Sequence, residues 1–557
     1  MTGHIYESMF PTPFIPQVGL FDFIFPSAPG VSTSKEFPET HPAFIDGVTG
    51  EVLFRGELHD RALRLKTGYK ELLHLKRGDT VCVWGSNSIE WIFAVYGAMA
   101  AGLVAAPHEL AHQYNNSGSS AMFVALENLA GFEQARAELE RPLEDNRVIL
   151  LCKPEHKPKG TKYHCIFEIL SERAEEAEHF DGTECYETQF LCYSSGTTGL
   201  PKGVMTTHNN MVSQMCTSHI CLDPMSSETD ALLGFLPMSH AFGLMAILLQ
   251  PLTQGVPAVI LPRFDELKAL AAIEKYKVTR ALFVPPVVLL FIHSQNTPKF
   301  NITSLKSVFS GAAPLSPELM AAFHKRYPHA TVTQGYGMTE TSPGALQARS
   351  EDSRAGHSGV GVLLPGYQAR LVMEDGRDAH PGERGELWLR SSSIMKGYHA
   401  NPEATAKTMA PGGWLKTGDV AVVDENNRFA IVDRVKELIK YKGFQVAPAE
   451  LEALLLQQPK VIDAGVVGVY DESQATELPR GYIVANPSLG IKTDADKAKL
   501  SKEVAAWVAG RVAPHKRLVG GVIIIDAVPK SPSGKILRNI LRKQAQQEFE
   551  SSAKAKL

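Results

Sequence analysis

The sequence predicts an α/β protein with a large N-terminal domain of doubly wound sheets, a small β-barrel-like subdomain and a small, mobile α+β domain at the C-terminus. Three observations predict this class. Short apolar strands alternate with amphipathic helices over the first two thirds of the chain, two-residue alternation begins near Pro381, and a smaller helix–strand pattern follows Asp433. The 557 residues are enough for several folding units.

The first two thirds of the chain show the βα alternation. Residues 80–85 predict a buried strand and residues 89–101 the helix after it, while the apolar runs at 147–152 and 258–261 predict further strands. Such alternation is typical of parallel sheets. The most apolar stretch, at 231–262, contains prolines and polar residues, so it predicts buried core and not a membrane span.

The last third of the chain has a different hydrophobic pattern. Residues 385–390 and 428–432 alternate as antiparallel strands do. After Asp433 the expected elements are a helix at 447–457, strands at 464–469 and 482–485, a helix at 496–511 and a strand at 522–525. The acidic run at 172–184 predicts a solvated helix and loop. We therefore divide the chain into residues 1–433 and 434–557.

Composition excludes several classes of function. The chain has 56 Lys+Arg against 60 Asp+Glu, a net charge of −4, which gives no support to nucleic-acid binding. Its seven cysteines form no pair with zinc spacing, which favours reduced thiols in an intracellular protein. No basic segment leads into an apolar one at the N-terminus, so we expect no secretory signal.

The most informative segment is residues 193–204, Tyr-Ser-Ser-Gly-Thr-Thr-Gly-Leu-Pro-Lys-Gly-Val. Glycines expose backbone N–H groups, while hydroxyls and an ammonium supply further donors to phosphate oxygens. The spacing is not that of a Walker A loop. By itself the segment is equally compatible with a surface linker, because Gly/Ser/Thr clusters are usually loops.

Three later segments point to a nucleotide site. In residues 334–340 we expect a loop in which Tyr336 stacks on a base, Thr339 meets a phosphate and Glu340 holds magnesium. Asp419 is expected on a tight turn, suited to ribose hydroxyls. Lys535 is expected on a glycine-containing loop near the C-terminus. Each segment alone could be an ordinary turn, and their order carries the argument.

The order of these motifs resembles the adenylate-forming superfamily, which includes acyl-CoA synthetases, 4-coumarate:CoA ligases, beetle luciferases and peptide-synthetase adenylation domains. The resemblance spans about residue 46 to the C-terminus, and it is greatest to 4-coumarate:CoA ligases and fungal relatives. It is carried by residues 193–204, 334–340, 393–398 and above all 432–450.

The resemblance implies a two-step reaction. A carboxylate attacks the α-phosphate of ATP to give acyl-AMP and pyrophosphate, and the thiol of coenzyme A then displaces AMP. Because a carboxylate must approach a polyphosphate, cationic groups are the main catalytic device. By resemblance, the catalytic residues are Lys535 for adenylation, Lys440 for thioester formation, His240 and Thr339, with Mg²⁺ on Glu340.

The resemblance also assigns binding residues. Those for ATP and AMP are Ser194, Ser195, Gly196, Thr197, Thr198, Gly199, Lys202, Gly311, Ala312, Ala313, Pro314, Gln334, Gly335, Tyr336, Gly337, Thr339, Asp419, Arg434, Gln445 and Lys535. Coenzyme A is assigned to Lys442 and Gly443, and the hinge of the mobile C-terminal domain to Lys436. The acyl pocket is assigned to His240, Phe242, Gly311, Gly335, Pro343 and Gly344.

The chain departs from relatives in three places. Phe242 stands where hydroxycinnamate ligases tend to carry a tyrosine that can meet the substrate's phenol, and Gly344 stands where a larger apolar residue is frequent. Both favour another aryl acid or a medium-chain fatty acid over p-coumarate. After Pro107 a segment present in relatives is missing, which indicates a shortened loop, an incomplete gene model or impaired folding.

The expected function is therefore a ligase that joins an aryl, cinnamate-like or medium-chain acid to coenzyme A. Alternatives are loading of a carrier protein, luciferase-like oxidation of the adenylate, or a noncatalytic binding protein, which the intact lysines disfavour. The last three residues, Ala555-Lys556-Leu557, resemble a peroxisomal import signal, so we expect an import receptor as partner and a peroxisomal, otherwise cytoplasmic, location.

Overall fold

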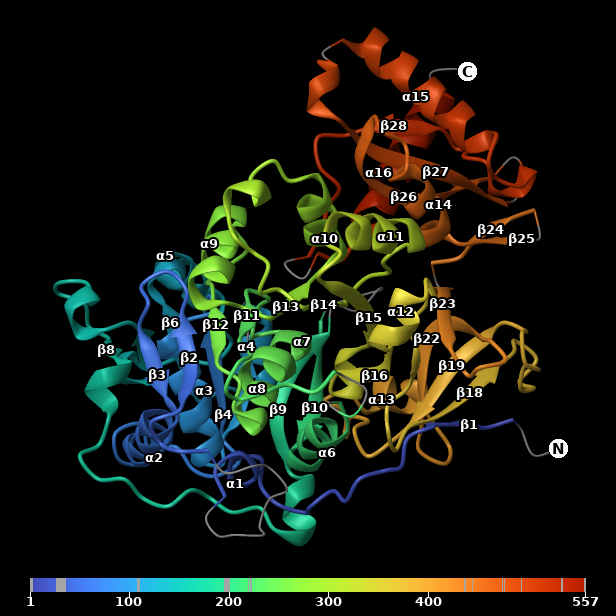
Figure 1. Cartoon of the computed structure of the whole chain (residues 1–557). Coiled ribbons are helices and arrows are strands. Elements are labelled where there is room, and N and C mark those ends of the chain that lie inside the picture. The colour runs from blue at the N-terminus through green and yellow to red at the C-terminus, as the bar shows by residue number, and fades with distance from the viewer. Residues whose placement is uncertain are drawn as a thin grey trace.

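Two mainly parallel sheets form the larger part of the molecule (Figure 1). The first has eight strands and is parallel from β9 to β8. In spatial order its strands are β20 (Gly397–Tyr398), β10 (Lys202–Thr207), β9 (Thr188–Ser194), β5 (Val104–Pro107), β4 (Thr80–Trp84), β6 (Ala121–Ala125), β7 (Val148–Leu151) and β8 (His164–Cys165).

The computed structural model describes residues 4–26, 37–107, 111–194, 201–218, 220, 223–434, 437–442, 444–472, 474, 476–491, 493–531 and 534–554.

The second sheet has nine strands and is parallel in its centre, from β15 to β2. Its strands are β17 (Val362–Leu363), β16 (Gly344–Gln347), β15 (Thr331–Gly337), β14 (Ser307–Ser310), β13 (Arg280–Phe283), β11 (Leu232–Gly234), β12 (Ala258–Ile260), β2 (Pro42–Asp46) and β3 (Val52–Phe54). The strands expected at 80–85, 147–152 and 258–261 are confirmed as β4, β7 and β12. The parallel α/β prediction is therefore correct.

Helices cover the two sheets. The helix expected after β4 is α3 (Ile89–Ala100), which begins where the Ser88 side chain accepts a hydrogen bond from the Trp91 N–H. The others are α1 (Leu20–Ile24), α2 (Arg55–Glu71), α4 (Ala111–Ser117), α5 (Leu129–Ala135), α6 (His208–Ser218), α7 (Ala241–Gly243), α8 (Gln250–Gln254), α9 (Glu266–Tyr276), α10 (Pro285–His293), α11 (Pro317–Arg326), α12 (Ser350–Arg354) and α13 (Pro402–Thr408). Residues 231–262 lie in the largest apolar core, as predicted.

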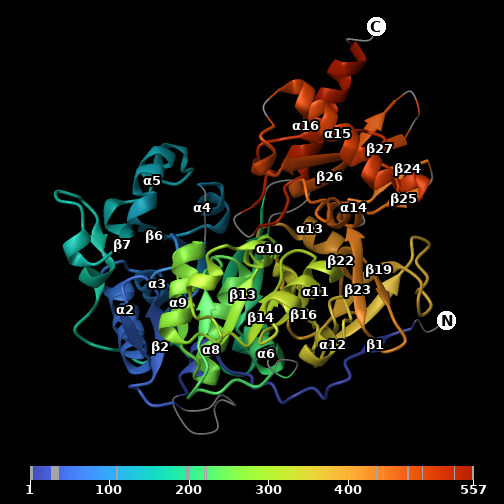
Figure 2. The same ribbon diagram turned by 45° about the horizontal axis from the view of Figure 1, so that its top comes forward.

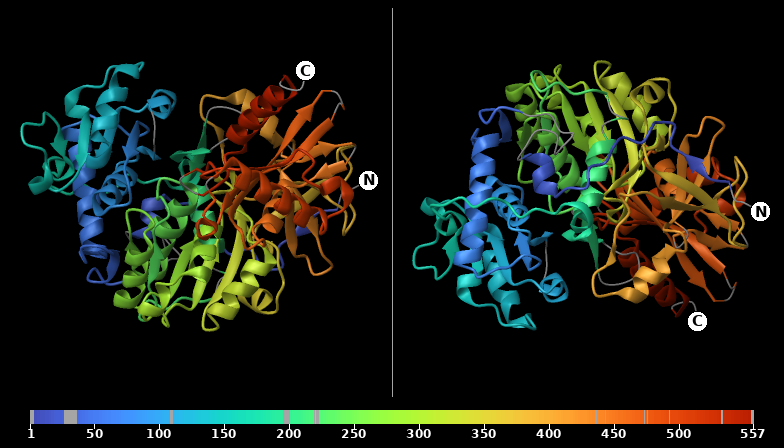
Figure 3. Two further views of the ribbon diagram at one scale, coloured as in Figure 1. Left: turned by 90° about the horizontal axis from the view of Figure 1, so that it is seen from above. Right: turned by 90° about the horizontal axis from the view of Figure 1, so that it is seen from below.

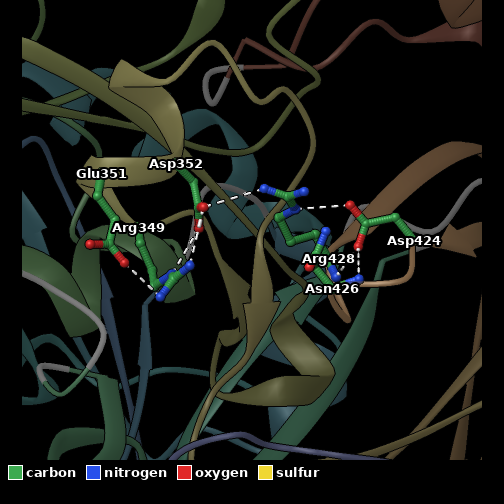
Figure 4. A network of polar contacts seen from close by, with 6 residues as sticks. All are labelled: Arg349, Glu351, Asp352, Asp424, Asn426 and Arg428. Carbon is green, nitrogen blue, oxygen red and sulfur yellow. Dashed lines mark hydrogen bonds and ion pairs between the residues drawn. The ribbon is translucent and has the colours of Figure 1, made fainter.

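A six-stranded antiparallel sheet is the subdomain expected from the alternating segments. It contains β1 (Tyr6–Glu7), β18 (Gln368–Val372), β19 (Gly385–Arg390), β22 (Trp414–Val423), β21 (Met409–Ala410) and β23 (Phe429–Arg434). A polar network joins the turn between β22 and β23 to α12 (Figure 4). There Asp352 accepts hydrogen bonds from Arg349 Nε at 2.7 Å and Arg428 Nη1 at 3.4 Å, and Arg428 Nε also donates to Asp424 at 2.8 Å.

The C-terminal segment forms its own small sheets and cores. It contains the hairpin β24 (Ile439–Tyr441) and β25 (Phe444–Val446), the sheet β26 (Val461–Asp471), β27 (Thr476–Ala485) and β28 (Val522–Ile524), and helices α14 (Pro448–Leu455), α15 (Asp494–Ala509) and α16 (Arg538–Lys554). It lies above β22 and β23 (Figure 2), on the opposite side of the molecule from α2 and β8 (Figure 3). A domain boundary at residue 433 stays a prediction.

The structure corrects three local expectations. Residues 172–181 form no helix, and the acidic run ends in a short 3₁₀ segment, because Glu175, Glu178 and Glu184 reach across to basic side chains near α2. Tyr336 lies in strand β15 and not in a loop, because β15 continues past its pairing with β14 and pairs Tyr336 with Leu346 of β16. Asp419 lies within β22 and not on a tight turn, because β22 continues past Gly418 and pairs Asp419 with Arg434.

Other expectations concern cysteines and membranes. The six cysteines in the described ranges are buried and free. None of the described helices combines the length and apolar character that a bilayer crossing requires. The segment that follows Pro107, the tripeptide 555–557 and residues 195–200, 435–436 and 443 lie outside the described residues, so the predictions made for them remain predictions.

Candidate active site

A cavity of about 860 Å³ lies where the three large sheets meet the C-terminal segment. Ser194 and Lys202, at the facing ends of β9 and β10, line one part of it. The carboxyl ends of β14 and β15 contribute Gly311 and Tyr336, and Lys535 reaches it from the C-terminal segment. Open parallel sheets bind ligands at the carboxyl ends of their strands. The cavity therefore combines groups that are more than 300 positions apart in the sequence.

One buried cluster joins the nine-stranded and six-stranded sheets. The Tyr336 hydroxyl donates to Asp419 Oδ2 at 2.5 Å, and Arg434 Nε lies 3.1 Å from Asp419 Oδ1. Asp419 is 3% exposed. Burial raises the pKa of Asp419, while Arg434 and the hydrogen bond from Tyr336 oppose that rise. The cluster holds the carboxylate and the guanidinium rigidly beside the cavity.

A second cluster surrounds Glu340, the middle residue of the short 3₁₀ turn Thr339–Thr341 after β15. Its Oε1 accepts a hydrogen bond from the Tyr398 hydroxyl at 2.7 Å, and its backbone oxygen accepts from the Met395 N–H at 2.9 Å. Lys202 Nζ lies 4.8 Å from the centre of the Tyr398 ring. Carboxylate, phenol and ammonium therefore meet at one wall of the cavity, close to the hydroxyl of Thr339, which also lines it.

Lys535 lies on a tight loop of the C-terminal segment. Its N–H donates to the Ser531 hydroxyl at 3.2 Å, and the Gly534 N–H donates to the Ser531 carbonyl at 2.8 Å. Gly534 has φ +81°, which favours glycine. Burial, and then the charge of Arg434, lower the pKa of Lys535 to about 8, although nearby carboxylates act in the other direction. The loop therefore places a partly desolvated ammonium in the cavity.

The opposite end of the cavity is mostly apolar. The rings of Phe242 and Phe309 meet edge to face, with centroids 5.7 Å apart. A Cβ added at Gly311 would lie 3.0 Å from the Phe242 ring, and one added at Gly335 would lie 2.5 Å from the Phe309 ring. Both positions therefore need glycine for space. His240, Met245, Pro343, Gly344, Leu346 and Leu364 complete this wall.

Comparisons with known proteins match almost the whole chain. The model of the AMP-binding enzyme family matches residues 32–399, and that of the AMP-binding enzyme C-terminal domain matches residues 450–535. A 4-coumarate–CoA ligase of Arabidopsis thaliana is 34% identical, covering 97% of this chain and 95% of the relative. A probable 4-coumarate–CoA ligase of Dictyostelium discoideum is 40% identical over 64% of this chain and 63% of its own length. The chain belongs to the AMP-binding enzyme family.

Two solved structures share the architecture of this chain. The anthranilate CoA ligase AuaEII with anthranoyl-AMP has a TM-score of 0.82 at 22% identity, covering 97% of this chain and 99% of its own. ATP-bound MatB from Rhodopseudomonas palustris has a TM-score of 0.81 at 24% identity, covering 95% and 99%. This AMP-binding enzyme is an AMP-forming acid–thiol ligase, which adenylates a carboxylic acid with ATP and joins the acyl group to coenzyme A.

Most described residues assigned from the sequence meet in the cavity of this AMP-binding enzyme. Fifteen line it, namely Ser194, Lys202, His240, Phe242, Gly311, Ala312, Gly335, Tyr336, Gly337, Thr339, Glu340, Pro343, Gly344, Arg434 and Lys535. Asp419 lies directly behind Tyr336 and Arg434. Gln334 supports the turn at 311–315, because its Oε1 accepts from the Leu315 N–H at 3.1 Å. Ala313 and Pro314 belong to that turn but do not line the cavity.

Three assigned residues lie apart from the cavity, on the exposed hairpin of β24 and β25. The Lys440 N–H donates to Glu477 at 2.7 Å, and the Lys442 N–H donates to Thr476 at 2.7 Å. Gln445 donates to Glu374 at 3.1 Å. All three residues are exposed. In this arrangement Lys535 lies at the cavity and Lys440 lies outside it.

Two residues that line the cavity were not assigned a role from the sequence. Tyr398 contacts both Glu340 and Lys202, and its only signal was its place at the end of the family segment 393–398. Gln214 lies on α6 and lines the apolar end. A glutamine ten residues beyond the phosphate-loop motif carries no spacing signal, so only the fold could reveal it.

Proposed function

We propose that this AMP-binding enzyme activates an apolar aryl, cinnamate-like or medium-chain acid. The observation that carries the proposal is a single cavity that connects the ammonium of Lys535 to a wall of aromatic and aliphatic side chains. The acid's carboxylate would point to Lys535, and its apolar body would lie between Phe242, Phe309 and Leu346. Burial of that body favours an apolar acid over a short polar one.

We assign the polar end of the cavity to the nucleotide. Lys202 and the loop 194–199 would hold the β- and γ-phosphates, and Tyr336 with the turn 311–314 would line the adenine. Asp419 accepts hydrogen bonds readily, so it would bind the ribose hydroxyls together with Arg434. Lys535 would neutralise the charge that develops between the attacking carboxylate and the α-phosphate, which is electrostatic catalysis in a desolvated site.

Glu340 suits magnesium in this arrangement. The described residues contain no group of three His, Cys, Asp or Glu side chains that could hold a metal ion. Mg²⁺ usually takes only one or two protein carboxylates and completes its shell with substrate phosphates and water, so one buried carboxylate is sufficient. When bound, the ion would screen the polyphosphate charge. Tyr398 orients Glu340 through its hydroxyl.

The exposed hairpin suits the second half-reaction. Rotation of the chain beyond a hinge at Lys436 would remove Lys535 and bring Lys440, Lys442, Gly443 and Gln445 to the cavity. One C-terminal domain with two catalytic faces would explain why Lys535 and Lys440 do not share the site in this structure. Lys440 would then support thioester formation, while Lys442 and Gly443 would contact coenzyme A.

Release of AMP and pyrophosphate across a panel of carboxylic acids, with and without coenzyme A, tests the proposal. We expect pyrophosphate release with apolar acids, and AMP with an acyl thioester only when coenzyme A is present. AMP without thioester would favour carrier loading or oxidation of the adenylate. No AMP with any acid would favour a noncatalytic protein.

Localisation is a separate proposal, carried by the tripeptide Ala555-Lys556-Leu557. We expect a fluorescent reporter that ends in the last residues of this chain to enter peroxisomes through an import receptor. Replacing Lys556 by glutamate in the same reporter is the control, and it is expected to remain cytosolic. A reporter that stays diffuse with the natural tripeptide would contradict the proposal.

A further inference from the structure

One polar side chain at the apolar end of the cavity has a buried oxygen with no hydrogen-bond partner among the described residues. Gln214 is 2% exposed and lines the cavity from α6. Among the described residues, its Oε1 is buried without a hydrogen-bond partner. Leaving a buried polar group unpaired is costly, because the group gives up its hydrogen bonds to water. Such a group inside a binding cavity indicates a partner on the ligand.

Gly344 is the residue that makes room for this amide. A Cβ added at Gly344 would lie 2.8 Å from Gln214 Nε2, closer than real Cβ contacts allow. The backbone of Gly344 is not in the left-handed region, so its conformation does not require glycine. The two positions are therefore complementary: the missing side chain at 344 leaves the space that the Gln214 amide occupies.

Two other polar side chains that line the cavity, Ser218 and Gln250, are hydrogen-bonded within the fold. The Ser218 hydroxyl donates to Gln250 Oε1 at 3.0 Å, and Gln250 Nε2 donates to the Met215 carbonyl at 3.4 Å. These side chains also line the cavity, but their main polar atoms already have partners. Gln214 therefore differs from Gln250, although the two glutamines are buried to a similar degree.

A hydroxyl group is the partner that fits a primary amide best. It can accept a hydrogen bond from Nε2 and donate one to Oε1, so it pairs with the amide in either of its two flipped orientations. A methyl or methylene group could satisfy neither atom. A carboxylate could pair only with Nε2 and would leave Oε1 without a donor.

We propose that Gln214 is a specificity-determining residue of this ligase, which selects acids that carry a hydroxyl on an otherwise apolar body. The inference rests on the proposed function, since it assumes that the acid's body occupies the apolar end. It also assigns the hydrogen bond to the substrate's hydroxyl to a different residue from the one at position 242. Phe242 has no hydroxyl to offer, and Gln214 supplies a hydrogen-bonding group from a different helix.

The test measures kcat/KM for pyrophosphate release with matched acid pairs. These are cinnamate against its 2-, 3- and 4-hydroxy derivatives, and octanoate against its hydroxylated derivatives. For wild type we expect one hydroxylated acid to exceed its plain partner roughly tenfold to a hundredfold, the range that one unpaired buried group produces. Gln214→Leu should bring that ratio close to one, with KM for ATP unchanged. Gly344→Ala should lower the ratio by displacing the amide.

Gln254→Leu is the matched control. Gln254 Oε1 is also buried without a partner among the described residues, but Gln254 does not line the cavity, so its replacement should leave the ratio unchanged. The melting temperature of Gln214→Leu should not fall, because an unpaired polar group is removed. A wild-type enzyme that adenylates plain acids as well as every hydroxylated acid would overturn the inference while upholding the ligase. No pyrophosphate with any acid would instead overturn the proposed function.

Discussion

The two ends of one cavity are built in different ways. At the nucleotide end, charged groups hold one another: Asp419 contacts Tyr336 and Arg434, and Glu340 contacts Tyr398. At the acyl end, aromatic rings and glycines shape an apolar wall that includes the Gln214 amide, whose Oε1 has no partner among the described residues. In the proposed function, the first end is preorganised for ATP, which is the same in every reaction. The second end would select the acid by shape and by one hydrogen-bonding group, so its residues can be replaced without disturbing the nucleotide end.

Replacement of Lys535 is expected to have the largest effect. Lys535→Ala removes the ammonium that would neutralise charge between carboxylate and α-phosphate, so acid-dependent pyrophosphate release should fall roughly 100- to 1000-fold. Thioester formation from supplied acyl-AMP and coenzyme A should be much less affected. Lys530→Ala is the control, because Lys530 Nζ already pairs with Asp463 at 2.7 Å. Equal loss in both half-reactions would remove the distinction between Lys535 and Lys440.

Loss of one hydroxyl at the nucleotide end should have the next largest effect. Tyr336→Phe removes the hydrogen bond to the Asp419 carboxylate, so KM for ATP should rise about tenfold to a hundredfold, the range for a hydrogen bond to a charged group. Discrimination between acids should not change. Tyr6→Phe is the control, because the buried Tyr6 hydroxyl has no partner among the described residues. A shift in acid preference for Tyr336→Phe would show that the two ends are coupled.

The pH dependence of adenylation tests the charge state of Lys535. Burial and the charge of Arg434 lower its pKa to about 8, so the free enzyme loses this ammonium as the pH rises through 8. We expect kcat/KM for ATP, measured by pyrophosphate release without coenzyme A, to fall about fivefold between pH 8 and pH 9. In Lys535→Arg the fall should move beyond pH 10, because a guanidinium stays protonated. An identical fall in that variant would assign the titration to another group.

The smallest expected effect is at the acyl end. Phe242→Tyr adds a hydroxyl beside the Phe309 ring, so kcat/KM for 4-hydroxycinnamate relative to cinnamate should rise, but less than tenfold, since an apolar pocket discriminates a hydroxyl weakly. KM for ATP should stay as in wild type. An unchanged acid preference would remove Phe242 from the set of residues that select the substrate.

The fold could be predicted from the sequence to a large extent, because the apolar periodicity that reports strands and helices is local. The strand β4 and helix α3 were found within one residue of their ends. Two site residues were placed on the wrong element, however. Tyr336 and Asp419 carry glycine neighbours that predict turns, but each pairs with a neighbouring strand, and pairing partners distant in the chain cannot be seen in a local pattern.

By itself, the sequence determined the family and the two-step chemistry, because those depend on short segments whose residue types and order are diagnostic, and it predicted which motifs bind the nucleotide. Only the tertiary structure decided that Lys535 lies in the cavity while Lys440 lies outside it, and that Tyr398 orients Glu340. It also decided which side chains line the apolar end of the cavity. Gln214 and Gly344 are 130 positions apart, and their complementarity is a matter of packing in three dimensions, which residue order does not record.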